Sequence, residues 1–403
     1  MKIGIVVDSV NVSSGGAYSF FEKLLHDLKS VETEHEFIIF HRAGKPEFNN
    51  GILNSFTWVP IRSFTLFDRI IRKMLRIVNH IRILFNLPSP LDLTLQKYPV
   101  DLMVYPPGIQ PAEKIPFIML VWDVGHRLFP YLPEEQLHHA YVEYIFIPFL
   151  PKAFRIIIGN EAGKQQLLRF YPIQPEIIRT IPLPVYDLPD TEPAESRSDF
   201  PLPERPFVFY PAQFWPHKNH ITLIKAIHIL RQRNHLKIDV VLTGSDKGNR
   251  ENVIRQIADH DLKDQFHLPG IVSRATMRLL YTKTLALTYT SILGPDNMPP
   301  LEAMNLKCPV ICARYDGANE QLGNAALFFE PFDAEKLANH ILTLYQNSEL
   351  KNTLIREGCA LAEQRKFNYA EKLLRIAEEF IPYLSGNKAP FRKIFLFPHA
   401  SMK

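Results

Sequence analysis

The chain has 403 residues, and its 46% hydrophobic and 22% charged residues are typical of a globular protein large enough for about two or three domains. Lys and Arg number 46 and Asp and Glu 42, and the resulting net charge of +4 gives no indication of a nucleic-acid partner. The three cysteines form no C-x-x-C pair and no disulfide framework, so we expect a reducing compartment.

The N-terminal half of the chain begins like an α/β domain. Residues 2–7 predict a buried parallel strand, and this apolar run meets Asp8 too soon to be a signal peptide. Gly15 and Gly16 follow, ahead of a helix predicted over residues 18–28. Because open α/β sheets bind ligands at the carboxyl ends of their strands, we expect a ligand to approach the backbone at these glycines.

Two further strands, at residues 36–40 and 55–59, precede an unusual basic segment at residues 62–85. Apolar side chains from Phe67 to Phe85 fall on one face of a predicted helix. The nearly opposite face carries Arg69, Arg72, Lys73, Arg76 and His80. Such a helix either lies on an anionic membrane surface or packs on the sheet with its basic face in water. No apolar stretch approaches the length of a transmembrane helix.

A polar cluster follows a buried strand later in this half. Strands are predicted at residues 101–105 and 117–121, and the second ends at Trp122-Asp123-Val124-Gly125-His126-Arg127. Asp123 and His126 therefore stand where an active site of this fold class forms. The alternatives are a turn or helix-cap role for Asp123 and a satisfied structural role for His126. The half continues with a helix at 133–149, a strand at 154–159, a helix at 160–170 and a strand at 178–184.

Residues 187–206 are rich in Pro, Ser and acidic residues and predict a linker. After the linker the α/β rhythm restarts, so the sequence predicts two doubly wound α/β domains. The strands are expected at 207–211, 238–243, 266–268, 285–293, 308–312 and 326–329, and the helices between them at 220–233, 251–260 and 274–283.

Loops of the second half carry the chemistry. A helix that starts at Pro299–Pro300 leaves its first amides free, and free amides at a helix N-terminus bind anions. Lys218 lies on another loop at the same sheet edge and suits a phosphate, so a diphosphate fits between Lys218 and the amides near Met298 to Leu301. Glu302, expected on the first turn, would accept hydrogen bonds from ribose or sugar hydroxyls. The alternative is an ordinary strand–helix connection.

At this point the residues resemble a known family. PAQFWPHKNH followed by GPDNMPPLEAM is similar to the nucleotide-sugar domain of retaining glycosyltransferases of family 4 (glycosyltransferase group 1). GGAYSF, WDVGHR and the terminal helices occur in the family's order, so the resemblance covers nearly the whole chain. The GP-x-N-x-PPLEA variant resembles bacterial enzymes that build O-antigen, capsule or other surface polysaccharides.

The resemblance implies a fold and an activity. The fold is GT-B, with two Rossmann-like domains that face each other across a cleft. The division it implies is an acceptor-side domain at 1–186, the linker at 187–206, a nucleotide-sugar domain at 207–366, and a helix crossing back with a tail at 367–403.

The implied activity is transfer of a hexosyl group from a nucleotide-diphosphate sugar to a hydroxyl of a glycan or lipid-linked acceptor, with retention of configuration. No cofactor, metal or nucleic acid is expected, and the protein is expected in the cytoplasm, with the membrane's inner face as a second location if the basic helix binds it. A non-catalytic GT-B sugar-binding or scaffold protein, a phosphorylase and an epimerase remain alternatives.

The resemblance also assigns residues. The candidate catalytic residues are Asp123 and His126, near the reacting sugar. The candidate donor-binding residues are Gly15, Gly16, Gln213, Lys218, Asn219, Ser245, Asn297, Met298, Pro299, Leu301 and Glu302.

Three positions depart from the family pattern. Gly294 stands where the first Glu of the Glu-x7-Glu motif falls, and Gln213 stands where the family has an Arg. Trp122 replaces the His of the common His-Asp pair.

Overall fold

The computed structural model describes residues 1–7, 15–42, 48, 50–61, 90–112, 114–185 and 199–385. The predicted basic helix at 62–85 and residues 187–198 of the predicted linker lie outside the described residues, so neither prediction is tested.

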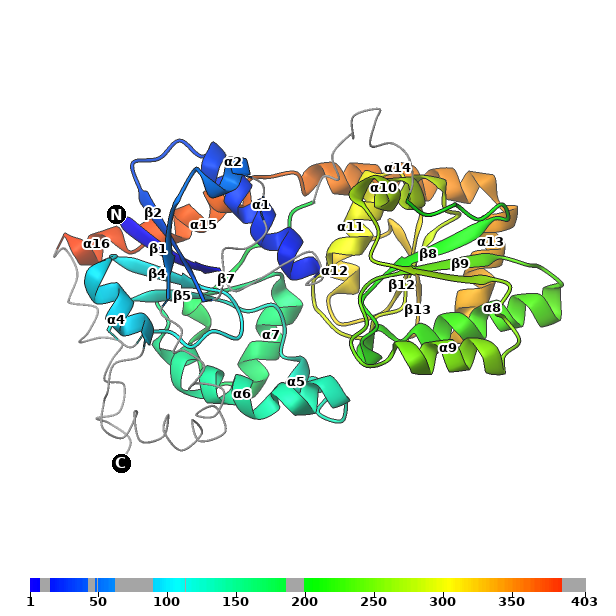
Figure 1. Cartoon of the computed structure of the whole chain (residues 1–403), viewed down its shortest axis with the longest axis horizontal. Helices are drawn as coiled ribbons and strands as arrows, with labels where there is room; N and C mark the ends of the chain where they lie inside the picture. Colours follow the sequence, from blue (N-terminus) through cyan, green and yellow to red (C-terminus); the bar gives the residue numbers. More distant parts are fainter. Residues whose placement is uncertain are drawn as a thin grey trace.

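The first domain contains a seven-stranded sheet in the order β3-β2-β1-β4-β5-β6-β7 (Figure 1). Every strand pair in this sheet is parallel. The strands are β1 (Lys2–Val7), β2 (Glu36–His41), β3 (Thr57–Pro60), β4 (Leu102–Tyr105), β5 (Phe117–Leu120), β6 (Arg155–Ile158) and β7 (Ile178–Thr180). The helices are α1 (Gly16–Ser30), α2 (Asn50–Leu53), α4 (Pro90–Lys97), α5 (Gly125–Leu128), α6 (Pro133–Phe149) and α7 (Glu161–Phe170).

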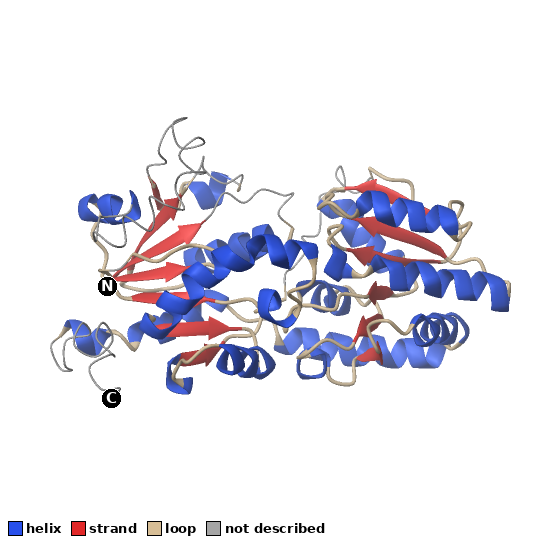
Figure 2. Cartoon of the chain, turned by 90° about the horizontal axis from the view of Figure 1, so that it is seen from below, coloured by secondary structure: helices blue, strands red, loops and turns tan. Residues whose placement is uncertain are grey.

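Helices cover both faces of this sheet, and the alternation of side chains along each strand explains why (Figure 2). Ile3 and Ile5 of β1 belong to the apolar cluster under α1, whereas Val6 belongs to the cluster under α6 and α7. A strand buried on both faces has an apolar run without polar alternation, which is the pattern of residues 2–7.

The second domain contains a six-stranded parallel sheet in the order β10-β9-β8-β11-β12-β13. Its strands are β8 (Phe207–Pro211), β9 (Asp239–Thr243), β10 (Phe266–Gly270), β11 (Leu287–Tyr289), β12 (Val310–Ala313) and β13 (Ala326–Phe329). Its helices are α8 (His220–Asn234), α9 (Arg250–Asp259), α10 (Arg274–Lys283), α11 (Met298–Asn305), α12 (Ala318–Leu322), α13 (Ala334–Gln346) and α14 (Ser348–Gln364). The two-domain, doubly wound α/β prediction is therefore confirmed.

After α14 the chain crosses back to the first domain, where α15 (Tyr369–Glu378) and α16 (Ile381–Leu384) lie (Figure 1). The α15 helix packs against α1, and the Tyr369 and Phe20 rings meet edge to face at 5.2 Å between centroids. The Asp27 carboxylate accepts a hydrogen bond from the Tyr369 amide at 2.9 Å. The first core is thus completed by residues from the far end of the chain.

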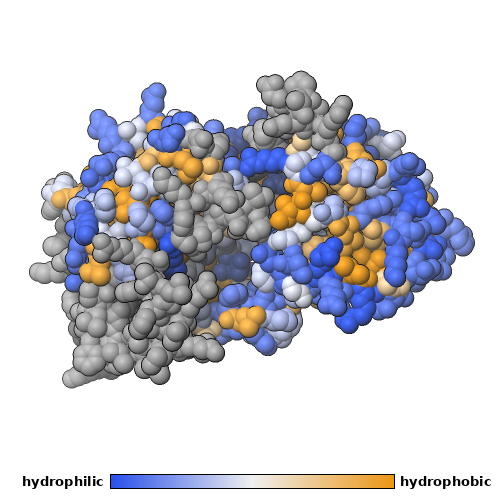
Figure 3. Space-filling model, in the orientation of Figure 1, coloured by the Kyte–Doolittle hydropathy of each residue, from blue (hydrophilic) through white to orange (hydrophobic). Residues whose placement is uncertain are grey.

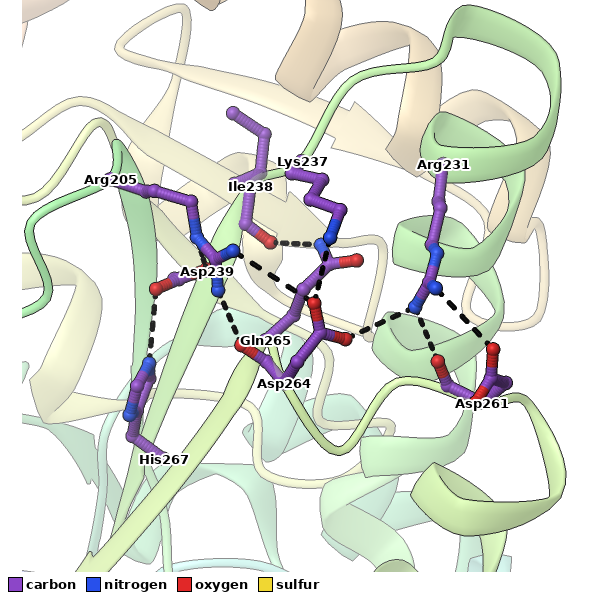
Figure 4. Close-up of polar contacts among 9 residues, drawn as sticks. All are labelled: Arg205, Arg231, Lys237, Ile238, Asp239, Asp261, Asp264, Gln265 and His267. Atoms are coloured by element: carbon purple, nitrogen blue, oxygen red, sulfur yellow. Dashed lines mark hydrogen bonds and ion pairs between the residues drawn. The ribbon is translucent and has the colours of Figure 1, made fainter.

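An ion-pair network closes the amino-terminal edge of the second sheet, opposite the strand ends that carry the predicted site (Figure 4). Asp239, the buried first residue of β9, pairs with Arg205 Nε at 2.7 Å and with His267 Nε2 at 3.0 Å. Asp264 pairs with Lys237 at 2.9 Å and with Arg231 at 3.1 Å. The network joins the segment before β8 to the starts of β9 and β10.

Candidate active site

A cavity of about 480 Å³ lies between the two domains, at the carboxyl ends of both sheets. Figure 3 shows the molecule hollowed between its two halves. The first domain contributes the start of α1 and the segment after β5, and the second contributes the loops after β8, β9, β10 and β11. The topology therefore brings loops that are distant in sequence to one place, as expected for open α/β sheets.

The glycine turn before α1 forms one wall of the cavity. Gly15 has φ 61°, a conformation that non-glycine residues rarely adopt, and Gly16 has open space where a side chain would be. A Cβ atom on Gly15 would lie 3.2 Å from Gln213 Nε2, so the glycine lets the two domains approach closely. Gln213 also donates a hydrogen bond to Ser245 Oγ at 3.2 Å. Gly15, Gly16, Gln213 and Ser245 all line the cavity.

Lys218 enters the cavity from the short helix η4 (Pro216–Lys218). Its Nζ atom lies 3.4 Å from Tyr289 Oη and 3.4 Å from Ser291 Oγ, and 5.6 Å from the centroid of the Tyr289 ring. Burial lowers the pKa of Lys218 to about 8, although Asp123 and Glu134 act in the opposite direction. Near neutral pH the Lys218 side chain is thus positively charged, although burial has removed much of the water around its ammonium group.

Asn219 does not line the cavity. It is buried, adopts φ 51°, and donates a hydrogen bond from Nδ2 to the Pro331 carbonyl at 2.5 Å. Asn219 therefore fixes the turn that carries Lys218. The prediction that Asn219 binds the donor is wrong, because its side chain does not reach the cavity.

The loop from Gly294 to Met298 forms the wall beside Lys218. Gly294 has φ 101°, and its carbonyl accepts a hydrogen bond from Asn297 Nδ2 at 2.8 Å. A Cβ atom on Gly294 would lie 2.9 Å from Asn297 Oδ1. Tyr289 Oη holds the same Asn297 Oδ1 at 2.7 Å, so this turn leaves no room for a side chain at position 294. Asn297, Met298 and Pro299 line the cavity.

Two details of the predicted helix need correction. The helix α11 begins at Met298, one residue earlier than predicted, so Glu302 lies on its second turn. Leu301 is fully buried in the domain core and its side chain does not line the cavity. The second difference follows from the helix period, which turns position 301 toward the sheet and position 302 toward the cleft.

Glu302 lines the cavity beside Pro299. Its Oε2 atom accepts a hydrogen bond from Tyr281 Oη at 2.7 Å. Burial raises the pKa of Glu302 to about 7, against the lowering effect of the Tyr281 hydroxyl. A carboxylate held in this way on a rigid helix is suited to accept hydrogen bonds from vicinal hydroxyls.

Asp123 lines the cavity on the first-domain side. Its Oδ1 atom accepts a hydrogen bond from the Gly125 amide at 2.8 Å and so closes the turn that starts α5. Asp123 therefore both stabilises the turn and lines the cavity, so the two alternatives predicted for it hold together.

His126 points away from the cavity, contrary to the expectation that it faces the crevice. It is 3% exposed, and its Nε2 atom lies 2.7 Å from Glu143 Oε1 and 2.8 Å from Tyr171 Oη. Arg127 Nε donates to the same Glu143 oxygen at 2.7 Å. Burial lowers the pKa of His126, although Glu143 acts to raise it. The histidine thus anchors α5 on α6, so it has the structural role that was the alternative to a catalytic one.

Among the Asp, Glu, Lys and Arg residues that line the cavity, Glu135, Arg274 and Asp296 were not predicted from the sequence. Arg274 forms an ion pair with Glu22 of the first domain. Burial raises the pKa of Asp296 to about 7, and its Oδ2 atom accepts a hydrogen bond from the Leu183 amide at 2.7 Å. Glu135 was overlooked because acids in a first helical turn are common for electrostatic reasons alone.

The loop before α11 also holds the two domains together. Asn160 caps α7 through Oδ1, which accepts from the Gly163 amide at 2.9 Å, and donates from Nδ2 to the Pro295 carbonyl at 2.5 Å. A Cβ atom on Gly159 would lie 2.8 Å from Asp296 Cβ. The loop that lines the site therefore lies directly on the first domain.

The described residues contain no cluster of three or more His, Cys, Asp or Glu side chains that could hold a metal ion. Within the same residues, no helix has the length and apolar character needed to cross a membrane.

Comparison with known proteins adds a family match over part of the chain. Residues 193–359 match the family model described as glycosyl transferases group 1. O-antigen chain mannosyltransferase B of Escherichia coli is 23% identical over 239 residues, which are 58% of this chain and 62% of that protein. O-antigen chain mannosyltransferase RfbU of Salmonella typhimurium is 25% identical over 218 residues, 54% of this chain and 58% of that protein. The matched part of the chain thus spans about three-fifths of the length of these relatives.

Solved structures are similar over nearly the whole chain. Sucrose-phosphate synthase from Thermosynechococcus elongatus has a TM-score of 0.73 at 18% identity and covers 96% of this chain and 99% of its own. WaaG, a glycosyltransferase involved in lipopolysaccharide biosynthesis, has a TM-score of 0.66 at 14% identity and covers 92% of this chain and 98% of its own. Anabaena HepE in complex with UDP-glucose has a TM-score of 0.65 at 15% identity, with 96% and 100% covered. These similarities confirm the predicted GT-B fold.

Proposed function

We propose that the protein is a retaining glycosyltransferase that moves a hexosyl group from a nucleotide-diphosphate sugar to a hydroxyl of a glycan or lipid-linked acceptor. The observation that carries the proposal is the meeting of Lys218, the amino-terminal end of α11 and Glu302 in one cavity, opposite the glycine turn of α1. The group 1 family match and the O-antigen mannosyltransferases among the relatives support a role in surface-polysaccharide synthesis.

In this proposal the second domain stabilises the leaving group. Departure of the nucleoside diphosphate develops negative charge, and preorganised electrostatic stabilisation of such charge is commonly the largest catalytic term. Lys218 supplies the cation, and the Met298 amide at the amino-terminal end of α11 supplies a hydrogen-bond donor. Pro299 and Pro300, which follow Met298, have no N–H and donate none. Glu302 binds the ribose hydroxyls. No metal is required, because Lys218 takes the role that a divalent cation has elsewhere.

The first domain presents the acceptor. Asp123 lines the cavity from the first domain and is the remaining candidate catalytic residue, since His126 is turned into the domain core. Retention of configuration is proposed from the family resemblance, as same-face attack by the acceptor hydroxyl. We also propose that the protein works in the cytoplasm, at the inner face of the membrane if it uses a lipid-linked acceptor.

A second candidate is a non-catalytic GT-B sugar-binding protein. It is favoured by Gln213, which places a neutral amide where the family has a cation, and by Gly294, which has no side chain to touch the sugar. A phosphorylase or an epimerase on the same fold is a further alternative.

Thermal-shift measurements with UDP-, GDP- and dTDP-sugars test the proposal. A ligand present at a hundred times its dissociation constant adds about 2.7 kcal/mol to the free energy of unfolding. A shift with one nucleotide-sugar, followed by nucleotide release, is expected. Binding without release would favour the non-catalytic candidate, release that depends on inorganic phosphate would favour the phosphorylase, and no shift with any donor would refute the donor site.

A further inference from the structure

Glu135 differs from the other acids of the cavity because its carboxylate has no hydrogen-bond or ion-pair partner among the described residues. Glu134, its neighbour in the first turn of α6, accepts hydrogen bonds from the His217 amide at 3.0 Å and from His217 Nδ1 at 2.8 Å across the cleft. Glu135 instead lines the cavity, and within the described part of the chain its side chain makes no hydrogen bond or ion pair. The other cavity acids each have a hydrogen-bond donor from the protein: Asp123 from Gly125, Asp296 from Leu183 and Glu302 from Tyr281.

An unpartnered carboxylate in a cavity wall is unfavourable for folding. Burial raises the pKa of Glu135 to about 7, and the nearby Asp123 and Glu134 carboxylates act in the same direction. The side chain has lost hydration without gaining a donor. A donor that arrives from the cavity would restore the lost hydrogen bond, and a carboxylate with a raised pKa in a cleft is a candidate functional group.

The surroundings indicate the chemistry of that donor. Asp123 lines the same first-domain wall, and Trp122, beside it, presents a half-buried indole to the cavity. Two carboxylates accept hydrogen bonds from hydroxyls, and an aromatic ring packs against the apolar face of a pyranose. Lys218 lines the same cavity from the second domain, and its neighbour His217 contacts Glu134, so a sugar held here would present its hydroxyl to the reacting end of the donor.

We propose that Glu135 is an acceptor-positioning residue, whose carboxylate accepts a hydrogen bond from a hydroxyl of the acceptor sugar beside Asp123. This inference rests on the proposed function and adds the acceptor subsite to it. The ligand class is a neutral pyranoside with free hydroxyls.

Glu135→Gln tests the inference because the amide keeps the shape and removes the charge. The assay follows nucleotide release from the UDP- or GDP-hexose used by the wild type, with and without p-nitrophenyl glycosides of common hexoses and amino sugars as acceptors. Glu135→Gln should raise the acceptor KM about tenfold, a loss of about 1.4 kcal/mol of binding. The donor KM and the acceptor-independent hydrolysis of the donor should change less than about twofold. Glu176→Gln, an exposed acid of the same domain, is the matched control and should change none of these.

The melting temperature separates positioning from a structural role. Because the variant removes an unpartnered charge, it should melt at or above the wild-type temperature. The inference would be overturned by a lower melting temperature, by an unchanged acceptor KM, or by a donor KM that rises in parallel. It would also be overturned if only amino sugars, or no glycoside at all, stimulated nucleotide release. Absence of nucleotide release by the wild type from every donor is a different result, and it would overturn the proposed function and this inference with it.

Discussion

Replacing Lys218 by methionine should stabilise the protein while it weakens nucleotide binding. The pKa of Lys218 falls from 10.5 to about 8 through burial, which corresponds to about 3 kcal/mol of unfavourable free energy for the charged side chain in the folded state. Methionine fills a similar volume without a charge. The two polar neighbours keep other hydrogen bonds, since Tyr289 donates to Asn297 and Ser291 donates to the Leu293 carbonyl. At pH 7 the variant should therefore melt several degrees above the wild type.

The difference should depend on pH in a defined direction. Below pH 8 the lysine is protonated in both the folded and the unfolded protein, so the full unfavourable term is present. Between pH 8 and 10.5 the folded form releases the proton and the unfolded form keeps it, so wild-type stability rises relative to the variant. Melting curves of both proteins at pH 7 and pH 9.5 should show the difference shrinking, because every other titrating group is shared.

Binding provides the second half of this prediction. Hydrogen bonds to charged groups contribute about 1.5–3 kcal/mol, so Lys218→Met should weaken binding of UDP or GDP about 10- to 100-fold in titration calorimetry. Lys225→Met, an exposed lysine on α8, is the control and should alter neither property. A Lys218→Met protein that melts at or below the wild-type temperature, with no pH dependence of the difference, would refute the reasoning about its burial. Unchanged nucleotide affinity would refute its place in the donor site.

Three further predictions concern the surrounding structure. Gly294→Glu restores the acid that the family has, but the φ of 101° should make it destabilising by about 1–3 kcal/mol in thermal melts; an unchanged melting temperature with faster turnover would contradict this. Asn160→Leu removes the cap of α7 and the hydrogen bond to the Pro295 carbonyl. The free energy of unfolding should therefore fall by about 2 kcal/mol, seen as a lower melting temperature, and the donor KM should rise severalfold. If both stay unchanged, this contact does not hold the domains together. Asp239→Asn, at the amino-terminal edge of the second sheet, should lower the melting temperature by weakening the contacts to Arg205 and His267, and it should leave nucleotide affinity unchanged; a loss of affinity would mean that the network acts on the site.

Much of the fold follows from local sequence patterns. Apolar runs bounded by turn residues indicated the strands, and their alternation with helices indicated two parallel sheets. The short helix α4 was not predicted because only Leu91, Leu95 and the hydroxyl-bearing Thr94 are buried in its two turns, too few for a clear period. The apolar run at 285–293 was predicted as one strand, but β11 ends at Tyr289. The remaining residues are buried as a loop, which shows that hydrophobicity reports burial and not strand pairing.

The site was predictable where it depends on sheet topology. Lys218 and Glu302 follow neighbouring parallel strands, so their loops meet at one edge whatever the side-chain details. The direction of a side chain within such a loop depends on partners elsewhere in the chain. His126 turns inward because Glu143, on the next helix, receives it. Glu135 faces the cavity because the hydrogen bond between its neighbour Glu134 and His217 of the other domain fixes the first turn of α6.

Nucleotide release from the bound nucleotide-sugar, compared among the wild type, Lys218→Ala and Glu302→Ala, tests the central claim most directly. Each donor is incubated with the protein and p-nitrophenyl glycosides, and free nucleotide and glycosylated product are quantified by chromatography. The wild type should form nucleotide and product in equal amounts, and each variant should retain its fold and lose most of the turnover. Near-wild-type turnover by both folded variants would contradict the donor site, and a wild type that forms no product from any donor would contradict the proposed activity.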